Sequence, residues 1–343
     1  MGHDLILDRL PISDGTAAIR VKRNLPNYLL EKAQSKMVMK SRSDQNSYPL
    51  ASVHWSSWFG VSIAGPVKSL MGGHVMRNFM LGCIVLFAMA GTAFSETKEP
   101  PKELTVDLGK GVKLELVLIP AGEFLMGSPD TDKDAQPDEK PQHRVRITKP
   151  FYLGKYLVTQ EQWQSVMGNN PSFFFKGPKN PVEQVSWDDC QKFLGKLNAK
   201  SAAGAGKFQL PSEAQWEYAC RAGSKTRYSF GDDETRLGDY AWYDKNSDNK
   251  THSVGEKKPN AWGLYDMHGN VWQWCQDSWK DGYYKESPVD DPTGPTGGSN
   301  RVIRGGGWIS PAWYCRSALR NGNLPGFGNF NLGLRVSRVP ADK

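Results

Sequence analysis

Eight tryptophans fall between residues 216 and 313, in a stretch that is otherwise dominated by turn-forming residues. From Gly223 onward the chain is rich in Gly, Asn, Asp and Pro and shows no long helical periodicity. Such a composition usually indicates disorder, but each tryptophan buries on the order of 200 Å² when it packs. A segment with so many tryptophans has enough apolar surface for an ordered core. We therefore expect an irregular globular fold with short strands and long ordered loops.

Regular elements are predicted mainly before this stretch. Residues 104–118 alternate apolar and polar side chains well enough for one or two strands. The charged segment 129–141 has a proline at each end and is predicted to be a surface loop. Three capping boxes mark helix starts, because a hydroxyl and the side chain three residues later both satisfy backbone N–H groups there. They begin at Thr159, Ser186 and Ser212, and the first and third helices should end near Gly168 and Gly223.

The N-terminal 95 residues do not resemble a domain. Met76-Arg-Asn is a short positive start, residues 79–90 are apolar, and Ala93-Phe-Ser95 fits a small-x-small cleavage site. This layout is typical of a secretory signal peptide. The apolar run is shorter than the roughly 20 residues of a membrane-spanning helix.

Two interpretations remain for the residues that precede this leader. We favour an overextended gene start, with the true start at Met71 or Met76, over a cytoplasmic tail before a membrane anchor. The expected organisation is residues 1–75 as overextended start or tail, 76–95 as signal peptide and 102–340 as one folded domain. The mature protein would then be periplasmic or secreted, and it would meet a membrane only through an uncleaved leader.

Charge and cysteine content limit the possible partners. The net charge is +7, but residues 1–95 hold 10 basic and 5 acidic residues, so the remainder is only +2. No basic stripe indicates nucleic-acid binding. The predicted mature chain has three scattered histidines and no CxxC motif, which disfavours a zinc or iron site. Its four cysteines allow two disulfides in three possible pairings: Cys190, Cys220, Cys275 and Cys315.

Four motifs occur in order along the chain. They are Ile119-Pro-Ala-Gly-Glu-Phe-Leu-Met-Gly127, Gly263-Leu-Tyr-Asp-Met-His-Gly-Asn-Val-Trp-Gln-Trp274, Arg301-Val-Ile-Arg-Gly-Gly-Gly-Trp308 and Gly333-Leu-Arg335. Together they resemble the formylglycine-generating enzymes, also called sulfatase-modifying factors, over roughly residues 112–338. The resemblance implies a single α+β domain, related to C-type lectins, with little regular secondary structure.

The resemblance also implies a calcium site. The family binds calcium with two side chains and two backbone carbonyls, at the positions of Asp266, Gly269, Val271 and Gln273. A calcium ion takes six to eight oxygen ligands. Asp266 stands where the family has Asn, and Gln273 where it has Glu, so the carboxylate has moved. The alternative is a tight turn before a buried strand, capped by Asp266.

The residues that carry the family's chemistry are incomplete in this chain. The family oxidises a substrate cysteine to an aldehyde with copper(I), which two neighbouring thiolates bind. Here Ser310 occupies the first of these positions and only Cys315 remains, while the serine of the preceding turn is Gly307. A single thiolate cannot chelate copper(I) linearly. The candidate catalytic residues are therefore Cys315 and Ser310, and copper is expected only if the oxidase activity is retained.

A disulfide between Cys220 and Cys315 is expected from the same resemblance. The family joins the position of Cys220 to that of Ser317. Residues 313–320 look like a strand, in which Cys315 and Ser317 would share a face. The alternative is that the cysteines are free buried thiols.

Two functions from different classes remain open. The first is a non-oxidase domain that binds a protein, peptide or glycan partner outside the cytoplasm. The second is a formylglycine-generating oxidase that acts on the cysteine of a sulfatase. The missing second cysteine favours the first. Loop 280–300 and the aromatic run 173–175 are candidate binding surfaces, and the alternative is that both pack the core.

Overall fold

The computed structural model describes residues 101–173, 176–201 and 206–339, with four short strands near the N-terminus. The chain divides into two compact units, Met1–Thr97 and Lys98–Lys343. In the first unit, β1 (Leu7–Pro11) pairs antiparallel with β2 (Ala17–Val21), and β3 (Ser52–Trp55) with β4 (Val61–Ala64). The expected signal peptide at 76–95 lies outside the described residues and stays a prediction. Within the described part, no helix has the length and apolar character needed to cross a membrane.

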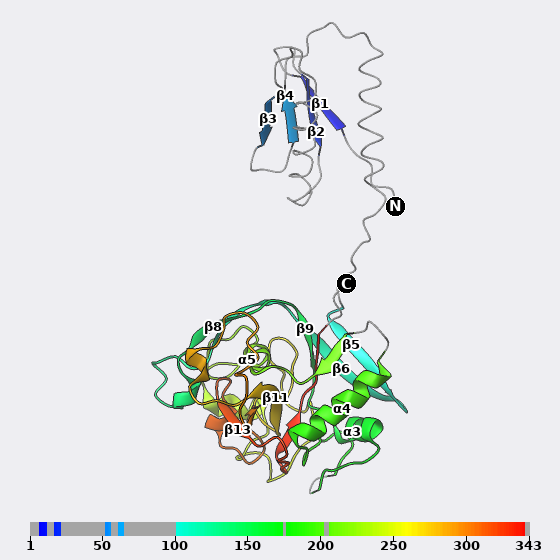
Figure 1. Ribbon diagram of the computed structural model, residues 1–343, viewed down its shortest axis with the longest axis vertical. Coiled ribbons are helices and arrows are strands. Elements are labelled where there is room, and N and C mark those ends of the chain that lie inside the picture. Colours follow the sequence, from blue (N-terminus) through cyan, green and yellow to red (C-terminus); the bar gives the residue numbers. More distant parts are fainter. Residues whose placement is uncertain are drawn as a thin grey trace. The chain divides into compact units, whose positions relative to one another are not determined.

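The second unit contains a five-stranded antiparallel sheet in the order β10-β15-β9-β6-β5. Its strands are β5 (Glu103–Gly109), β6 (Val112–Ile119), β9 (Phe151–Gly154), β10 (Lys207–Gln209) and β15 (Ser337–Val339). Helices α3 (Gln160–Met167) and α4 (Trp187–Lys200) lie side by side next to this sheet (Figure 1). The strand prediction for 104–118 is confirmed as the hairpin β5–β6.

All three helix starts follow the predicted capping boxes. Thr159 Oγ1 accepts from the N–H of Gln162 at 3.3 Å, and the Gln162 side chain accepts from the N–H of Thr159 at 2.9 Å. The same reciprocal pattern opens α4 at Ser186 and α5 (Glu213–Arg221) at Ser212. Helix α3 ends at Gly168 with a left-handed φ of 90°, which glycine adopts without a steric penalty.

A second sheet has four strands in the order β13-β12-β11-β14. Antiparallel pairs join β13 to β12 and β12 to β11, whereas β11 and β14 run parallel. The hairpin of β7 (Gly122–Met126) and β8 (His143–Ile147) is separate, and α5 contacts both it and the four-stranded sheet. The strands are β11 (Trp272–Ser278), β12 (Arg301–Arg304), β13 (Arg320–Asn323) and β14 (Leu332–Leu334).

The four-stranded sheet separates two hydrophobic clusters, because successive side chains of a strand point to opposite faces. Trp272, Trp274 and Ile303 belong to the cluster that includes α3 and α4. Cys275 and Val302 belong to the cluster around α5. The two faces of this sheet therefore serve different parts of the domain.

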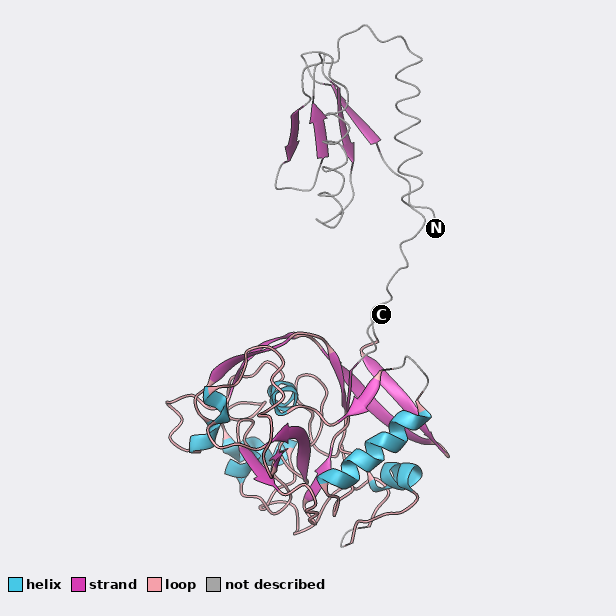
Figure 2. Ribbon diagram, in the orientation of Figure 1, coloured by secondary structure: helices cyan, strands magenta, loops and turns pink. Residues whose placement is uncertain are grey.

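Long ordered loops connect these elements (Figure 2). Between α5 and β11, the described chain contains only the 3-10 turn Glu234–Arg236 and the short helix α6 (Leu237–Tyr240). Trp216 and Trp274 are nevertheless fully buried. The prediction of a single α+β domain with little regular secondary structure is confirmed.

One local prediction is wrong and a second holds only in part. Residues 313–320 are not a strand, because Ala312–Cys315 form a 3-10 turn and β13 begins only at Arg320. Pro311, whose ring fixes φ, precedes this turn, and its carbonyl accepts from the N–H of Tyr314 at 2.9 Å. The segment 129–141 lies at the surface as predicted, except that Pro137–Glu139 form a 3-10 turn that buries Glu139 completely.

Candidate functional site

A groove of about 290 Å³ lies on the face of the four-stranded sheet that points away from α5. Its floor comes from the strands, as Trp272, Ile303, Asn321, Asn323 and Leu332. One wall is the segment 309–314 and the other is the segment 327–331. The groove therefore unites parts of the chain that are far apart in sequence.

No charged side chain lines this groove, although 23% of the whole chain is charged. Its polar side chains are Ser310 and four asparagines, and the remaining lining is aliphatic or aromatic, including Trp272 and Tyr314 with their indole N–H and hydroxyl. Large exposed apolar side chains also gather in the segments that border it: Ile309, Trp313, Leu324 and Phe327. A concentration of exposed apolar residues around a concave surface is typical of a binding site.

Ser310 lies in the first wall, and Cys315 directly follows that wall in the sequence. Ser310 Oγ accepts from the N–H of Gly307 at 3.0 Å, and the residue lines the groove. The preceding turn packs directly on Cys315, because a Cβ on Gly306 would lie 2.7 Å from Cys315 Sγ. Gly306 also has a left-handed φ of 70°, so only glycine fits this turn well.

The Cys315 thiol belongs to the core. It is fully buried in a cluster with Tyr228, Leu237 and Tyr243. Burial raises the pKa of the Cys315 thiol well above its ordinary value. The thiolate is the form that attacks substrates and binds soft metals, and burial disfavours it here.

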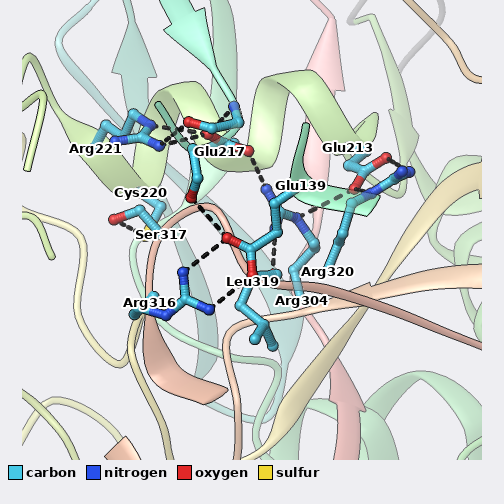
Figure 3. A network of polar contacts seen from close by, with 12 residues as sticks. Glu139, Glu213, Glu217, Cys220, Arg221, Arg304, Arg316, Ser317, Leu319 and Arg320 are labelled. Carbon is cyan, nitrogen blue, oxygen red and sulfur yellow. Dashed lines mark hydrogen bonds and ion pairs between the residues drawn. The ribbon is translucent and has the colours of Figure 1, made fainter. Parts of the chain in front are cut away.

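A network of buried ion pairs lies on the other face of the sheet (Figure 3). Arg316 donates two hydrogen bonds of 2.7 Å to Glu139, and Arg320 donates two, of 2.8 and 2.6 Å, to Glu213. Arg304 pairs with Glu217, which also accepts from Arg221. These pairs hold the floor and one wall of the groove, because Arg304 ends β12, Arg320 begins β13 and Arg316 follows the segment 309–314.

Residues 108–340 match the sulfatase-modifying factor enzyme 1-like domain family. The chain belongs to this family. It is 31% identical over 286 residues to a formylglycine-generating enzyme of Streptomyces coelicolor, which covers 64% of this chain and 88% of that protein. A second relative, the chaperone protein LppX of Paenibacillus barcinonensis, is 30% identical over 243 residues, which cover 57% of this chain and 79% of that protein.

Two solved structures have the same fold. Treponema denticola variable protein 1 superposes with a TM-score of 0.64 and 33% identity, over 70% of this chain and 100% of that chain. PvdO from Pseudomonas aeruginosa superposes with a TM-score of 0.62 and 32% identity, over 70% of this chain and 99% of that chain.

The two candidate catalytic residues of this sulfatase-modifying factor domain do not fit copper(I). The soft ion needs thiolate or thioether ligands, and the hydroxyl of Ser310 is a hard donor. Cys315 is the one sulfur ligand at these two positions, and it is a buried thiol packed against Gly306. The residues of this site therefore lack the pair of soft ligands that copper(I) chemistry requires.

The predicted disulfide between Cys220 and Cys315 is not formed in the structure, where all four described cysteines are free thiols. The argument from a shared strand face was wrong, because Cys315 lies in a 3-10 turn. Cys220 Sγ instead lies 3.7 Å from Ser317 Oγ. Burial raises the pKa of the Cys220 thiol to about 12.

The four positions expected to bind calcium surround a polar junction that is already occupied by protein donors. Gln273 Oε1 accepts from Trp216 Nε1 and Arg335 Nε, both at 2.9 Å. The Asp266 carboxylate accepts from the N–H of Gly255 at 2.9 Å and from the Asn270 side chain at 3.4 Å, and burial raises its pKa. Gln273 Oε1 already accepts two hydrogen bonds, one of them from a guanidinium, so this oxygen as arranged does not fit a calcium ion, which takes six to eight oxygens.

His268 is a buried residue whose role sequence reasoning missed. Its Nε2 accepts from the N–H of Ser229 at 3.1 Å, so the proton lies on Nδ1, which donates to the Cys315 carbonyl at 2.8 Å. Burial lowers the pKa of His268 to about 4, so it is neutral at physiological pH. The sequence places His268 between Met267 and Gly269 in the longest motif. That position marks it as a candidate residue but does not reveal that its ring binds Ser229 and Cys315. His268 thus fixes the turn that carries Cys315.

The two candidate binding surfaces have different outcomes. Phe173 is highly exposed, and residues 174–175 lie outside the described residues. In loop 280–300, Tyr283 and Tyr284 are buried in the core, whereas most of the loop is exposed and lines a second pocket of about 390 Å³, so the binding role of this loop stays a prediction. The groove on the four-stranded sheet was not predicted.

Proposed function

We propose that this chain is an exported sulfatase-modifying factor domain that binds a polypeptide partner in its groove and does not oxidise it. The observation that carries the proposal is that the two candidate catalytic positions hold a serine, Ser310, and one fully buried free thiol, Cys315. This arrangement removes the soft ligand pair, while the groove above it is intact and bordered by exposed apolar side chains. The relative named as a chaperone supports a role in binding.

The test of the oxidase alternative uses the full chain with copper, oxygen, a reductant and a peptide that bears Cys-x-Pro-x-Arg. We expect the peptide thiol to remain and no aldehyde to form. The relatives named formylglycine-generating enzymes are the reason to make this test. Aldehyde formation that Cys315→Ser abolishes would restore the oxidase function and a sulfatase as the partner.

A variant that restores a second sulfur ligand also tests whether the chain has lost its copper(I) site. Ser310→Cys places a sulfur in the groove lining, five positions before the buried Cys315. We expect it to bind copper(I) more tightly than the unchanged chain, while Ser310→Ala does not. Equal stoichiometric copper(I) binding by the unchanged chain and Ser310→Cys would contradict the proposed loss of the metal site.

The binding role is tested with a peptide library selected on the full chain. Leu324→Asp places a charge at the groove border, where Leu324 is 57% exposed. Leu125→Asp is the matched control, because Leu125 is 44% exposed on β7 and does not line the groove. Selected peptides should bind the control variant but not Leu324→Asp. Equal binding to both variants would show that the groove is not the binding site.

A further inference from the structure

The asparagines of the groove have a defined orientation. Asn321 Oδ1 accepts from the N–H of Gly322 at 2.7 Å, and Asn323 Oδ1 accepts from that of Leu324 at 3.0 Å. Asn329 Oδ1 accepts from the N–H of Phe330 at 2.8 Å. Each oxygen thus already accepts one hydrogen bond from the next residue of the chain, whereas no hydrogen bond within the described residues uses the amide nitrogens, which are free to donate to a ligand.

Ser310 follows the same rule. Its oxygen accepts from the N–H of Gly307, so its hydroxyl proton is available for a ligand acceptor. The three oriented asparagines and Ser310 therefore present hydrogen-bond donors, and no carboxylate lines the groove to accept a donor in return. A ligand rich in uncharged hydrogen-bond acceptors would therefore pair with these free donors.

Most ligands offer donors as well as acceptors. An ordinary peptide has one backbone N–H for each carbonyl, and an N–H buried without an acceptor costs free energy. Sugar hydroxyls also donate as well as accept. Proline has a carbonyl but no N–H, so a proline-rich segment presents acceptors alone.

The shape of the apolar lining agrees with this chemistry. The rings of Trp272 and Tyr314 meet edge to face with centroids 5.8 Å apart, and Trp313 stacks on Tyr314 at 3.8 Å. Phe327 stands on the opposite wall. Aromatic-lined grooves are the surfaces that recognise polyproline II helices, which have solvated carbonyls and are already ordered before binding.

We propose that the groove binds an uncharged, proline-rich segment of a partner protein in the polyproline II conformation. This rests on the proposed function, in which the groove binds a polypeptide, and it adds the class of sequence. The donors of Ser310, Asn321 and Asn323 bind the segment's carbonyls, and the aromatic rings pack against its pyrrolidine rings. No lining side chain carries the negative charge that would pair with the arginine of a sulfatase-type motif.

The test is a binding titration of the full chain with N-acetylated, C-amidated decaproline, in which tryptophan fluorescence reports binding. An uncharged decapeptide of Ala, Gly and Ser is the comparison, because it has the backbone N–H groups that proline lacks. We expect decaproline to bind at least about tenfold more tightly, as one unpaired buried donor alone costs about this factor.

Asn323→Asp is the decisive variant. It keeps the oxygen that holds the N–H of Leu324 and exchanges the donor for a second, charged oxygen. We expect it to weaken decaproline binding by roughly tenfold or more, since a donor to the ligand becomes an acceptor. Asn249→Asp, at an exposed asparagine outside the groove, is the matched control and should bind normally.

The outcomes separate this inference from the proposed function. If both peptides bind equally and Leu324→Asp abolishes both, the proline preference is overturned while the binding function stands. If neither peptide binds, or if Asn323→Asp binds decaproline as the unchanged chain does, the inference is overturned. Binding of chitohexaose in place of the peptides, lost in Leu324→Asp, would overturn both the inference and the polypeptide partner.

Discussion

The ion pair of Glu139 and Arg316 gives the sharpest test of how the groove is held. The Glu139 carboxylate accepts two hydrogen bonds from Arg316, one from Ser128 Oγ at 2.7 Å and one from the N–H of Gln136 at 3.1 Å. Both charged side chains are almost completely buried. Glu139→Ala leaves the guanidinium of Arg316 without its main partner, and breaking such a buried pair costs about 3–5 kcal/mol.

This loss translates into a large shift in melting temperature. For a domain of 150–250 residues, 1 kcal/mol corresponds to about 2–4 °C. Glu139→Ala is therefore expected to lower the melting temperature by roughly 10 °C, measured by calorimetry and checked by urea denaturation. The double variant Glu139→Leu with Arg316→Met should recover part of the loss, because it leaves no unpaired charge.

The matched control is the pair of Glu123 and Arg144. Its charged atoms also approach to 2.6 Å, but both side chains are exposed. Water screens such a pair, so Glu123→Ala should change the melting temperature little. If Glu139→Ala is no more harmful than Glu123→Ala, burial is not what makes this network stabilising, and our account of the groove's support is refuted.

Three further predictions concern the buried thiol, histidine and carboxylate. Ser317→Cys should form a disulfide with Cys220, whose Sγ lies 3.7 Å from Ser317 Oγ, and the chain-entropy model gives about 4–5 kcal/mol for a loop of this length; an alkylatable Cys220 in the native variant would contradict it. Because the pKa of His268 falls from about 6.5 in the unfolded chain to about 4 in the folded one, only the unfolded chain binds the proton between these values. The urea midpoint should therefore fall as the pH drops from 6.5 to 4, by the equivalent of about 3 kcal/mol, and His268→Gln should flatten this slope. A chelator should leave the melting temperature unchanged, because N–H donors already hold the oxygens of Asp266 and Gln273; a decrease that Asp266→Ala abolishes would establish the calcium site instead.

The features that sequence reasoning predicted correctly are local ones. A capping box joins residues three apart, so Thr159, Ser186 and Ser212 reveal their helices without tertiary information. Glu139 and Arg316 are 177 positions apart, and the local composition of the loop 129–141 gives no sign that Glu139 is buried. The groove was missed for the same reason, because it forms only when β11 pairs in parallel with β14, sixty residues further along.

Some of the strand assignment failed because tertiary contacts override local propensity. Residues 313–320 contain aromatic and apolar residues that favour a strand. The 3-10 turn at Ala312–Cys315 forms instead of a strand, because it buries Cys315 against Gly306 and lets the Cys315 carbonyl accept a hydrogen bond from His268. Gly306, which tolerates the close approach of Cys315, and His268, which donates to the Cys315 carbonyl, both lie outside segment 313–320, so this segment alone does not predict the turn.

The motifs that identify the family are mainly structural. In the longest motif, Trp274 Nε1 donates to the Val185 carbonyl at 3.0 Å and Gln273 holds Arg335. Arg335, in the last motif, donates to the Gly154 carbonyl at 2.7 Å and so ties the two sheets together. These contacts maintain the scaffold whether or not Ser310 and Cys315 can bind a metal. Membership of the family therefore follows from residues that hold the fold, and function has to be argued from the groove. In this chain the groove has no soft ligand pair and no charge, and its oriented donors and aromatic rings are groups that bind a chain of acceptors.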